Sequence, residues 1–174
     1  METAVKTKWN LDTVHSEIGF KVKHMMISTV TGHFADFNAT VTTASDDFSN
    51  AEFDFVATVG SINTKNADRD NHLKSNDFFN AEAYPELKFT STSFDGEKLV
   101  GDLTIRNVTK SITLHVDFNG VAVDPYGQTK AGFEITGAIN RKDFGLAWSA
   151  VTEAGSVVVG EKVKLVVDLQ FVRE

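Results

Sequence analysis

The segment AEFDFVATV, residues 51–59, decides the fold class, because its apolar side chains occupy every second position. One side of the extended chain carries Ala51, Phe53, Phe55, Ala57 and Val59. The other side carries Glu52, Asp54, Val56 and Thr58. Successive side chains of a strand point to opposite faces, so this pattern predicts a strand with one buried face and one face in water.

The same alternation recurs on both sides of this segment. Residues 17–24 place Ile18, Phe20, Val22 and His24 on one face, and a strand over residues 32–43 does the same with Phe37, Ala39 and Val41. The apolar sets of the second half are Leu87 and Phe89; Leu99, Leu103 and Ile105; Ile112, Leu114, Val116 and Phe118; Ala131, Phe133, Ile135 and Ile139; Val163, Leu165, Val167, Leu169 and Phe171. The chain is therefore expected to be an all-β, antiparallel protein.

Turn residues separate these strands. Asp95-Gly96 and Asn119-Gly120 tolerate the positive φ that hairpins need, and residues 124–127 (DPYG) suit a β-turn. Such close spacing indicates up-and-down connections. Strands that each have one apolar face are expected to curl into a barrel, because a flat sheet would leave two open edges.

Residues 61–85 break the alternation. We expect a short helix from Asp68 to Leu73 and a further turn at residues 77–79, before Pro85 returns the chain to an extended form. A long crossing segment in a barrel commonly covers an opening. Residues 7–174 are expected to form a single domain, preceded by an N-terminal extension of residues 1–6.

Composition restricts the function. The 174 residues contain 17 Lys and Arg against 24 Asp and Glu, a net charge of −7, so nucleic acid is not an expected partner. No membrane span is expected. The chain has no cysteine, which excludes disulfides, thiolate zinc sites and cysteine nucleophiles. Fourteen Phe residues supply large apolar surface that needs no hydrogen-bond partner.

The first residues, METAVKTK, contain no apolar run of the length that a signal peptide requires. Taken as written, the sequence therefore indicates a cytoplasmic protein. The alternative is a periplasmic protein whose export signal has been removed.

Candidate chemical sites are weak. His15, His24 and His33 recur every nine residues, but nine residues of a strand span roughly 30 Å, so the three cannot converge unless the chain turns between them. A turn near residues 25–31 would be needed to bring His24 and His33 together. We expect no metal site, and we expect His15 to anchor a turn with Ser16. No nucleophile elbow or phosphate-binding glycine loop occurs.

The wall of Phe, Leu, Ile and Val allows two interpretations. The barrel interior is filled, as in most small barrels, or small residues such as Ala39, Ala57 and Gly137 leave room for an elongated apolar ligand. Periodicity alone favours the filled core, because protein interiors are close-packed.

An ordered series of motifs resembles a known family. The series consists of residues 9–12 (WNLD) with His15-Ser16, 20–24 (FKVKH), 32–34 (GHF), 61–64 (SINT), 70–75 (DNHLKS), 77–79 (DFF), 84–89 (YPELKF), 101–105 (GDLTI) with 108–110 (VTK), and 140–145 (NRKDFG). Together they are similar to the YceI-like family of lipocalin-like, polyisoprenoid-binding proteins, from Trp9 to about Val172.

The resemblance implies an extended eight-stranded antiparallel lipocalin-like barrel with a short helical cover, which forms homodimers and needs no cofactor. It favours the open interior. The tunnel residues expected from their shared strand face are Phe20, Val22, Phe37, Phe53, Phe55, Phe89, Leu103, Leu114, Val116, Phe133, Ile135, Leu165 and Val167. Candidates for contact with a polar lipid head group are His24, His72, Lys74, Asn140 and Arg141, although His72 and Arg141 also suit a role in holding the cover to the barrel.

The expected function is non-enzymatic binding, transport or storage of a long-chain isoprenoid or acyl lipid: a polyisoprenoid, an isoprenoid quinone or a fatty-acid derivative. One alternative is an enzyme that acts on a lipid in the same tunnel, with His24 or His72 as general base. Another is a stress or secretion factor with a filled barrel that acts through its surface.

Overall fold

Eleven strands form one antiparallel sheet in the computed structural model, which describes residues 6–25, 27–44, 48, 50–146, 148 and 159–174. The strands are β1 (Thr7–Leu11), β2 (Glu17–His24), β3 (Ser28–Phe34), β4 (Phe37–Thr43), β5 (Glu52–Thr58), β6 (Ile62–Asn63), β7 (Glu86–Phe94), β8 (Lys98–Ile105), β9 (Val108–Val123), β10 (Thr129–Asn140) and β11 (Val159–Arg173). The helices of the described residues are too short and too polar to cross a membrane.

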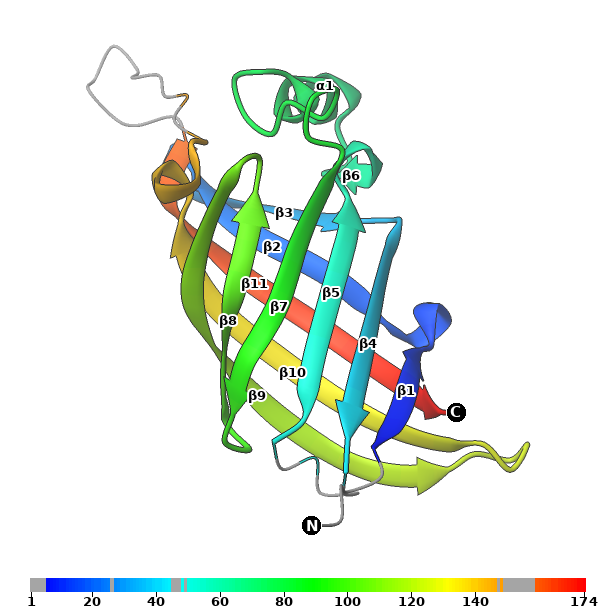
Figure 1. Cartoon of the computed structure of the whole chain (residues 1–174). Coiled ribbons are helices and arrows are strands. Elements are labelled where there is room, and N and C mark those ends of the chain that lie inside the picture. Colours follow the sequence, from blue (N-terminus) through cyan, green and yellow to red (C-terminus); the bar gives the residue numbers. More distant parts are fainter. Residues whose placement is uncertain (1–5, 26, 45–47, 49, 147, 149–158) are drawn as a thin grey trace.

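The sheet closes into an eight-stranded barrel, as predicted (Figure 1). β1 pairs with both β4 and β11, which closes the order β1-β4-β5-β7-β8-β9-β10-β11. β2 continues β1 along β11, β3 pairs with β2, and β6 pairs with β3. Two consecutive strands therefore share one position in the barrel wall in three cases: β1 with β2, β3 with β4, and β5 with β6. Closure pairs each strand of the barrel with a neighbour on both sides along at least part of its length.

The prediction of one continuous strand over residues 32–43 is wrong, because two strands occupy this range. β3 ends at Phe34 and β4 begins at Phe37. The amides of Ala35 and Asp36 donate instead to the backbone and side-chain oxygens of Ser61, at distances of 3.1 and 3.0 Å. Ser61 is the last residue of the 3-10 helix η2 (Val59–Ser61). Its oxygens accept the hydrogen bonds that these two amides would otherwise donate to a neighbouring strand.

The prediction of a hairpin at Asn119-Gly120 is also wrong. β9 continues through both residues, and its register with β10 changes between Gly132, opposite Gly120, and Phe133, opposite Phe118. Asn119 is therefore the extra residue of a β-bulge, and Gly120 takes a φ of +106°. The other two predicted turns are confirmed, with Gly96 and Gly127 at positive φ.

The predicted short helix is α1 (Ala67–Lys74), which lies over one end of the barrel (Figure 1). Asn66 caps it by accepting a hydrogen bond from the amide of Arg69 at 3.0 Å. The guanidinium of Arg69 donates to Thr64, and the carboxylate of Asp70 accepts from the same residue. Thr64, which is buried, thus fixes the helix to the chain that follows β6.

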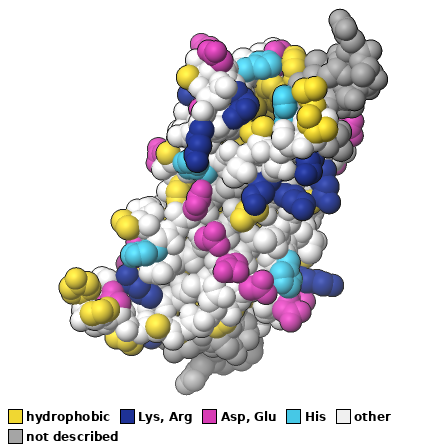
Figure 2. Space-filling view, turned by 180° about the vertical axis from the view of Figure 1, so that it is seen from behind, with side chains coloured by type: hydrophobic (Ala, Val, Ile, Leu, Met, Phe, Trp, Pro, Cys, Tyr) yellow, Lys and Arg dark blue, Asp and Glu magenta, His cyan; other side chains and the backbone are white. Residues whose placement is uncertain are grey.

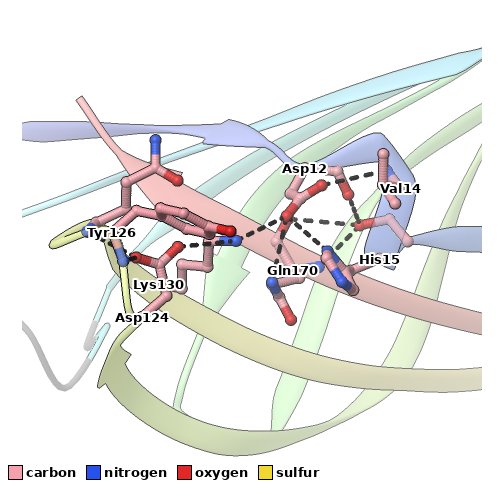
Figure 3. Close-up of polar contacts among 9 residues, drawn as sticks. Asp12, Val14, His15, Asp124, Tyr126, Lys130 and Gln170 are labelled. Carbon is pink, nitrogen blue, oxygen red and sulfur yellow. Dashed lines mark hydrogen bonds and ion pairs between the residues drawn. The ribbon is translucent and has the colours of Figure 1, made fainter.

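A polar cluster joins the start of the barrel to the β9–β10 hairpin (Figure 3). The carboxylate of Asp12, before the 3-10 helix η1 (Thr13–His15), lies 2.8 Å from Nδ1 of His15 and 3.1 Å from Nζ of Lys130. Lys130 also lies 3.3 Å from Asp124 in the hairpin turn. The hydroxyl of Ser16 donates to the backbone oxygen of Asp12 at 2.7 Å, so His15 and Ser16 hold a turn, as predicted.

The half of the barrel away from α1 is packed with aromatic rings. Phe133 lies at its centre, with ring centroids 5.0 Å from Phe48 and 5.5 Å from Phe53. Trp9, Phe53 and Phe133 are each no more than 1% exposed. The filled-core interpretation therefore describes this half of the molecule.

Candidate functional site

The other half of the barrel, beneath α1, encloses a cavity of about 140 Å³. Apolar side chains form nearly all of its wall, with Arg141 as the one charged residue that lines it within the described part of the chain. Eight of the thirteen predicted tunnel residues line this cavity: Phe20, Val22, Phe55, Phe89, Leu103, Leu114, Leu165 and Val167. The strand face chosen from the sequence thus includes much of the wall.

The other five predicted tunnel residues lie outside the cavity. Phe53, Val116, Phe133 and Ile135 are in the packed aromatic half, and Phe37 packs against a small cluster around Phe34. They share the inward strand face with the cavity residues, but they lie at a different depth along the barrel axis. They do not line the cavity, so we expect them to pack the core and not to contact a ligand.

The cover contributes wall residues that the strand pattern did not identify. Leu73 of α1, together with Phe78 and Phe79 of the turn that follows, lines the cavity. These three apolar side chains stand in a segment that is otherwise mostly polar. This contrast was the feature of the sequence that could have identified them as cavity residues. Ile18, Ile105, Ile112, Ile139 and Val163 complete much of the wall from the strands.

A second hollow of about 400 Å³, the vestibule, adjoins the cavity between α1 and the β2–β3 hairpin. The two share Phe20, Val22, Leu73, Phe78 and Val159. Polar and charged residues of the vestibule are Lys23, His24, Asn66, Asp68, Arg69 and His72. An apolar chamber therefore adjoins a space lined partly by polar groups, which is the arrangement that an amphiphile requires.

Two predicted head-group residues, His24 and His72, line the vestibule. The Nε2 of His72 lies 2.8 Å from a carboxylate oxygen of Asp77. The imidazole ring also packs edge-on against Trp148 and Phe78, with centroid distances of 4.8 and 5.1 Å. These contacts hold the ring in place between the cover and the chain that follows β10.

Arg141 lines the cavity, but its guanidinium is committed to the backbone. Its Nε donates to the carbonyl of Gly160 at 2.8 Å, and its terminal nitrogens donate to the carbonyls of Leu146, Trp148 and Val159. Burial lowers the pKa of this guanidinium from its usual value, partly offset by the negative charge of Glu161. The geometry fits the structural role, in which Arg141 ties the 3-10 helix η3 (Arg141–Phe144) to the start of β11.

Lys74 and Asn140 line neither the cavity nor the vestibule. Lys74 is in the last turn of α1. Asn140 caps η3, because its side-chain oxygen accepts a hydrogen bond from the amide of Lys142 at 3.0 Å. Gly145 ends η3 with a φ of +81°, and Phe144 is 2% exposed, so residues 143–145 form a turn that is packed by its Phe side chain.

The histidines of β2 and β3 lie in different places. His24 is opposite Ser28 at the hairpin end, whereas His33 is opposite Gly19. Five residues of strand separate these positions, so the turn between them does not bring the two imidazoles together. Within the described ranges, no three His, Asp or Glu side chains are grouped as a metal site requires.

Comparisons with known proteins agree with this architecture. The chain is 40% identical to a UPF0312 protein of Staphylococcus epidermidis over 95% of its own length and 97% of the relative's. The crystal structure of a YCEI protein from Campylobacter jejuni aligns with a TM-score of 0.73 and 35% identity, covering 100% of this chain and 99% of that one.

Two more distant structures share the fold. Burkholderia cenocepacia BcnA aligns with a TM-score of 0.79 and 19% identity, covering 92% of this chain and 98% of that one. A polyisoprenoid binding domain from Saccharophagus degradans aligns with a TM-score of 0.71 and 15% identity, covering 95% and 98%. The sequence profile of the YceI-like domain matches residues 9–171. The chain therefore belongs to the YceI-like domain family.

Proposed function

We propose that this protein binds a long-chain amphiphilic lipid without transforming it, with the hydrocarbon in the cavity and the polar end in the vestibule. The observation that carries the proposal is the apolar cavity that shares part of its wall with a partly polar hollow. Burial of hydrocarbon contributes roughly 25 cal/mol per Å², so binding needs no directional contact along most of the chain. The polyisoprenoid binding domain with the same fold supports a lipid ligand.

Size restricts how such a ligand is held. The cavity, at about 140 Å³, is close to the volume of an engineered cavity that accepts one benzene ring. A polyisoprenoid, an isoprenoid quinone or a fatty-acid derivative is longer than this space, so it has to extend into the vestibule. We infer that the protein holds the apolar end of its ligand in the barrel and acts in transport or storage.

The first test is native mass spectrometry of the purified protein, followed by organic extraction and identification of the released lipid. The proposal predicts a stoichiometric long-chain isoprenoid or acyl compound. A ligand-free mass that stays unchanged after incubation with such lipids would contradict it and would favour action through the protein surface.

A matched pair of variants connects the bound lipid to the cavity. Val163 lines the cavity from β11, so Val163→Phe is expected to fill the space and reduce the lipid recovered. Val121 of β9 is 39% exposed, so Val121→Phe adds the same side chain outside the barrel and should leave recovery unchanged. Equal recovery from both variants would place the lipid elsewhere.

The enzyme alternative has its own test. His24 and His72 line the vestibule, within reach of a lipid head group placed there. The wild type and the His72→Ala variant are each incubated with a long-chain acyl ester. Neither protein should hydrolyse the ester faster than buffer does. Hydrolysis by the wild type that is lost in His72→Ala would contradict the binding proposal and support an enzyme. Homodimer formation and the cytoplasmic location stay predictions.

A further inference from the structure

The hydrogen-bonded wall of the barrel is interrupted between β9 and β10. The register of the two strands runs from Val123 opposite Thr129 to His115 opposite Thr136, and both strands continue beyond that last pair. Past it, within the described residues, β9 pairs with β8 alone and β10 with β11 alone. The barrel is therefore split along its side, at the level of the cavity.

A surface groove of about 580 Å³ lies over this split. Thr113, Thr136 and Ala138 line it from the two separated strands. Leu114 and Leu165 line both this groove and the internal cavity. At this point a single layer of side chains separates the cavity from solvent.

Leu114 fills the split because the residue beside it has no side chain. A Cβ on Gly137 would overlap the Cδ2 atom of Leu114. Leu114 is 5% exposed, so its side chain closes the wall at the place where the backbone ladder is missing. Its closure depends on packing, and a change of rotamer moves a Leu side chain without breaking backbone hydrogen bonds.

Charge distinguishes the mouth of the groove from the wall beside it. Lys98, Lys162 and Lys164 line the groove. Next to it, four carboxylate residues stand opposite one another across neighbouring strands: Glu17, Asp168, Glu134 and Asp117. Figure 2 shows this row of acidic side chains crossing the outer face, with Lys and Arg side chains gathered beside it. An anion is attracted to the groove and repelled by the adjacent row.

We propose that the split between β9 and β10 is a lateral portal, through which an amphiphile with an anionic head group enters and leaves the cavity. Leu114 is its gate, and the three lysines hold the head group at the mouth while the hydrocarbon passes the gate. This proposal rests on the lipid binding proposed above. It adds the route and the charge of the ligand, and it places the head group at the groove in place of the vestibule.

Stopped-flow fluorescence with cis-parinaric acid, a long-chain anionic fatty acid that fluoresces in apolar surroundings, tests the gate. Leu114→Ala removes the gate and should raise the association and dissociation rate constants together by about tenfold, a factor equivalent to about 1.4 kcal/mol of barrier. Leu169→Ala is the matched control. It also deletes a buried Leu side chain, but Leu169 lies opposite Phe133 in the filled half and lines neither the cavity nor the groove, so the association rate should not change.

A second variant tests the groove without disturbing the interior. Ala138 is exposed on the outer face, so Ala138→Phe should cover the split and slow association. Thr90→Phe adds the same ring to the exposed face of β7, which is paired on both sides there, and should leave the rate unchanged. Raising NaCl from about 20 to about 500 mM should slow association of the wild type by screening the lysines.

The outcomes separate this proposal from the one on which it rests. Wild-type association rates in both Leu114→Ala and Ala138→Phe, with parinaric acid still bound, would overturn the portal and leave the vestibule as the route. An equal acceleration by Leu169→Ala would also overturn it. Failure of the wild type to take up parinaric acid at all would overturn the proposed lipid binding, and the portal with it.

Discussion

At the scale of single residues, surroundings decide whether a cation is free to meet a ligand. Arg141 lines the cavity, as a head-group residue would, yet its guanidinium donates to four backbone carbonyls. These carbonyls belong to Leu146 and Trp148, which follow η3, and to Val159 and Gly160 at the start of β11. A planar guanidinium offers five N–H donors in a fixed geometry, whereas the ammonium group of a lysine offers three from a single atom.

Arg141→Ala should therefore destabilise the protein. We expect a loss of about 3 kcal/mol in the free energy of unfolding, because buried carbonyls lose charged hydrogen-bond donors, and Arg141→Lys should recover little of it. Urea denaturation measures the change. The control is Lys142→Ala, whose ion pair with Glu161 is exposed to solvent, so this variant should have nearly wild-type stability. Wild-type stability with weakened lipid binding would instead make Arg141 a head-group residue.

The contribution of Asp12 to the stability of the protein is expected to depend on pH. Burial alone raises the pKa of its carboxyl, but hydrogen bonds from His15 and Lys130 outweigh burial and hold the pKa below its ordinary value of 3.8. A lowered pKa in the folded state adds stability above pH 3.8, and this contribution is lost as the pH falls through the folded-state value.

Asp12→Asn should consequently be less stable than the wild type at pH 7, and the difference should shrink as the pH falls below about 4. Urea denaturation at several pH values measures both curves. Asp102→Asn, on the exposed face of β8, serves as the control and should follow the wild type throughout. A difference that is the same at pH 3 and pH 7 would contradict the role of the Asp12 charge.

At the scale of elements, the long strand β9 depends on its bulge. Gly120 has a φ of +106°, a backbone conformation that side chains with a Cβ rarely adopt. The bulge lets β9 continue past the extra residue and reach the hairpin that carries Asp124. In Figure 1 this hairpin projects beyond the barrel at the end opposite α1.

Gly120→Ala should lower the free energy of unfolding by about 1 kcal/mol through backbone strain, since a Cβ at this position meets no other atom within 4 Å. Thermal denaturation provides the measurement. Gly60→Ala isolates the effect, because its Cβ also meets open space and its φ is outside the positive region, so its stability should match the wild type. Equal stability of the two variants would show that the bulge accepts any residue.

At the scale of the whole molecule, the barrel divides into a filled half and a hollow half. Phe53 is fully buried in the filled half, where its ring packs against Phe55, Phe94 and Phe133. Phe20 lies between the cavity and the vestibule and lines both. The same residue type on the same inward face therefore has two different roles.

Phe53→Ala and Phe20→Ala should have opposite effects. Phe53→Ala should cost about 3 to 5 kcal/mol of unfolding free energy and leave the affinity for parinaric acid near the wild-type value. Phe20→Ala should cost less stability and change that affinity, because its ring borders the ligand space. Urea denaturation and fluorescence titration measure the two effects. A reversal of this pattern would place the ligand in the aromatic half.

Sequence patterns were sufficient to predict the fold class, the short helical cover and the inward strand faces. These properties depend on local rules: side chains alternate along a strand, and Pro and Gly mark turns. It also supported the family, because the motifs occur in one order along the chain. The separation of β3 from β4 and the bulge at Asn119 were not predicted from the sequence, because each depends on a hydrogen-bond partner that is distant in sequence.

Which of the inward residues share the cavity depends on how the strands are arranged in three dimensions. Alternation identifies the inward face of a strand, but the depth of each residue in a barrel depends on the tilt and register of all neighbouring strands. Phe53 and Phe55 are two residues apart, yet only Phe55 lines the cavity. The hydrogen bonds of Arg141 and the split beside Leu114 likewise arise from strands that meet in three dimensions, and no local pattern encodes where two strands separate.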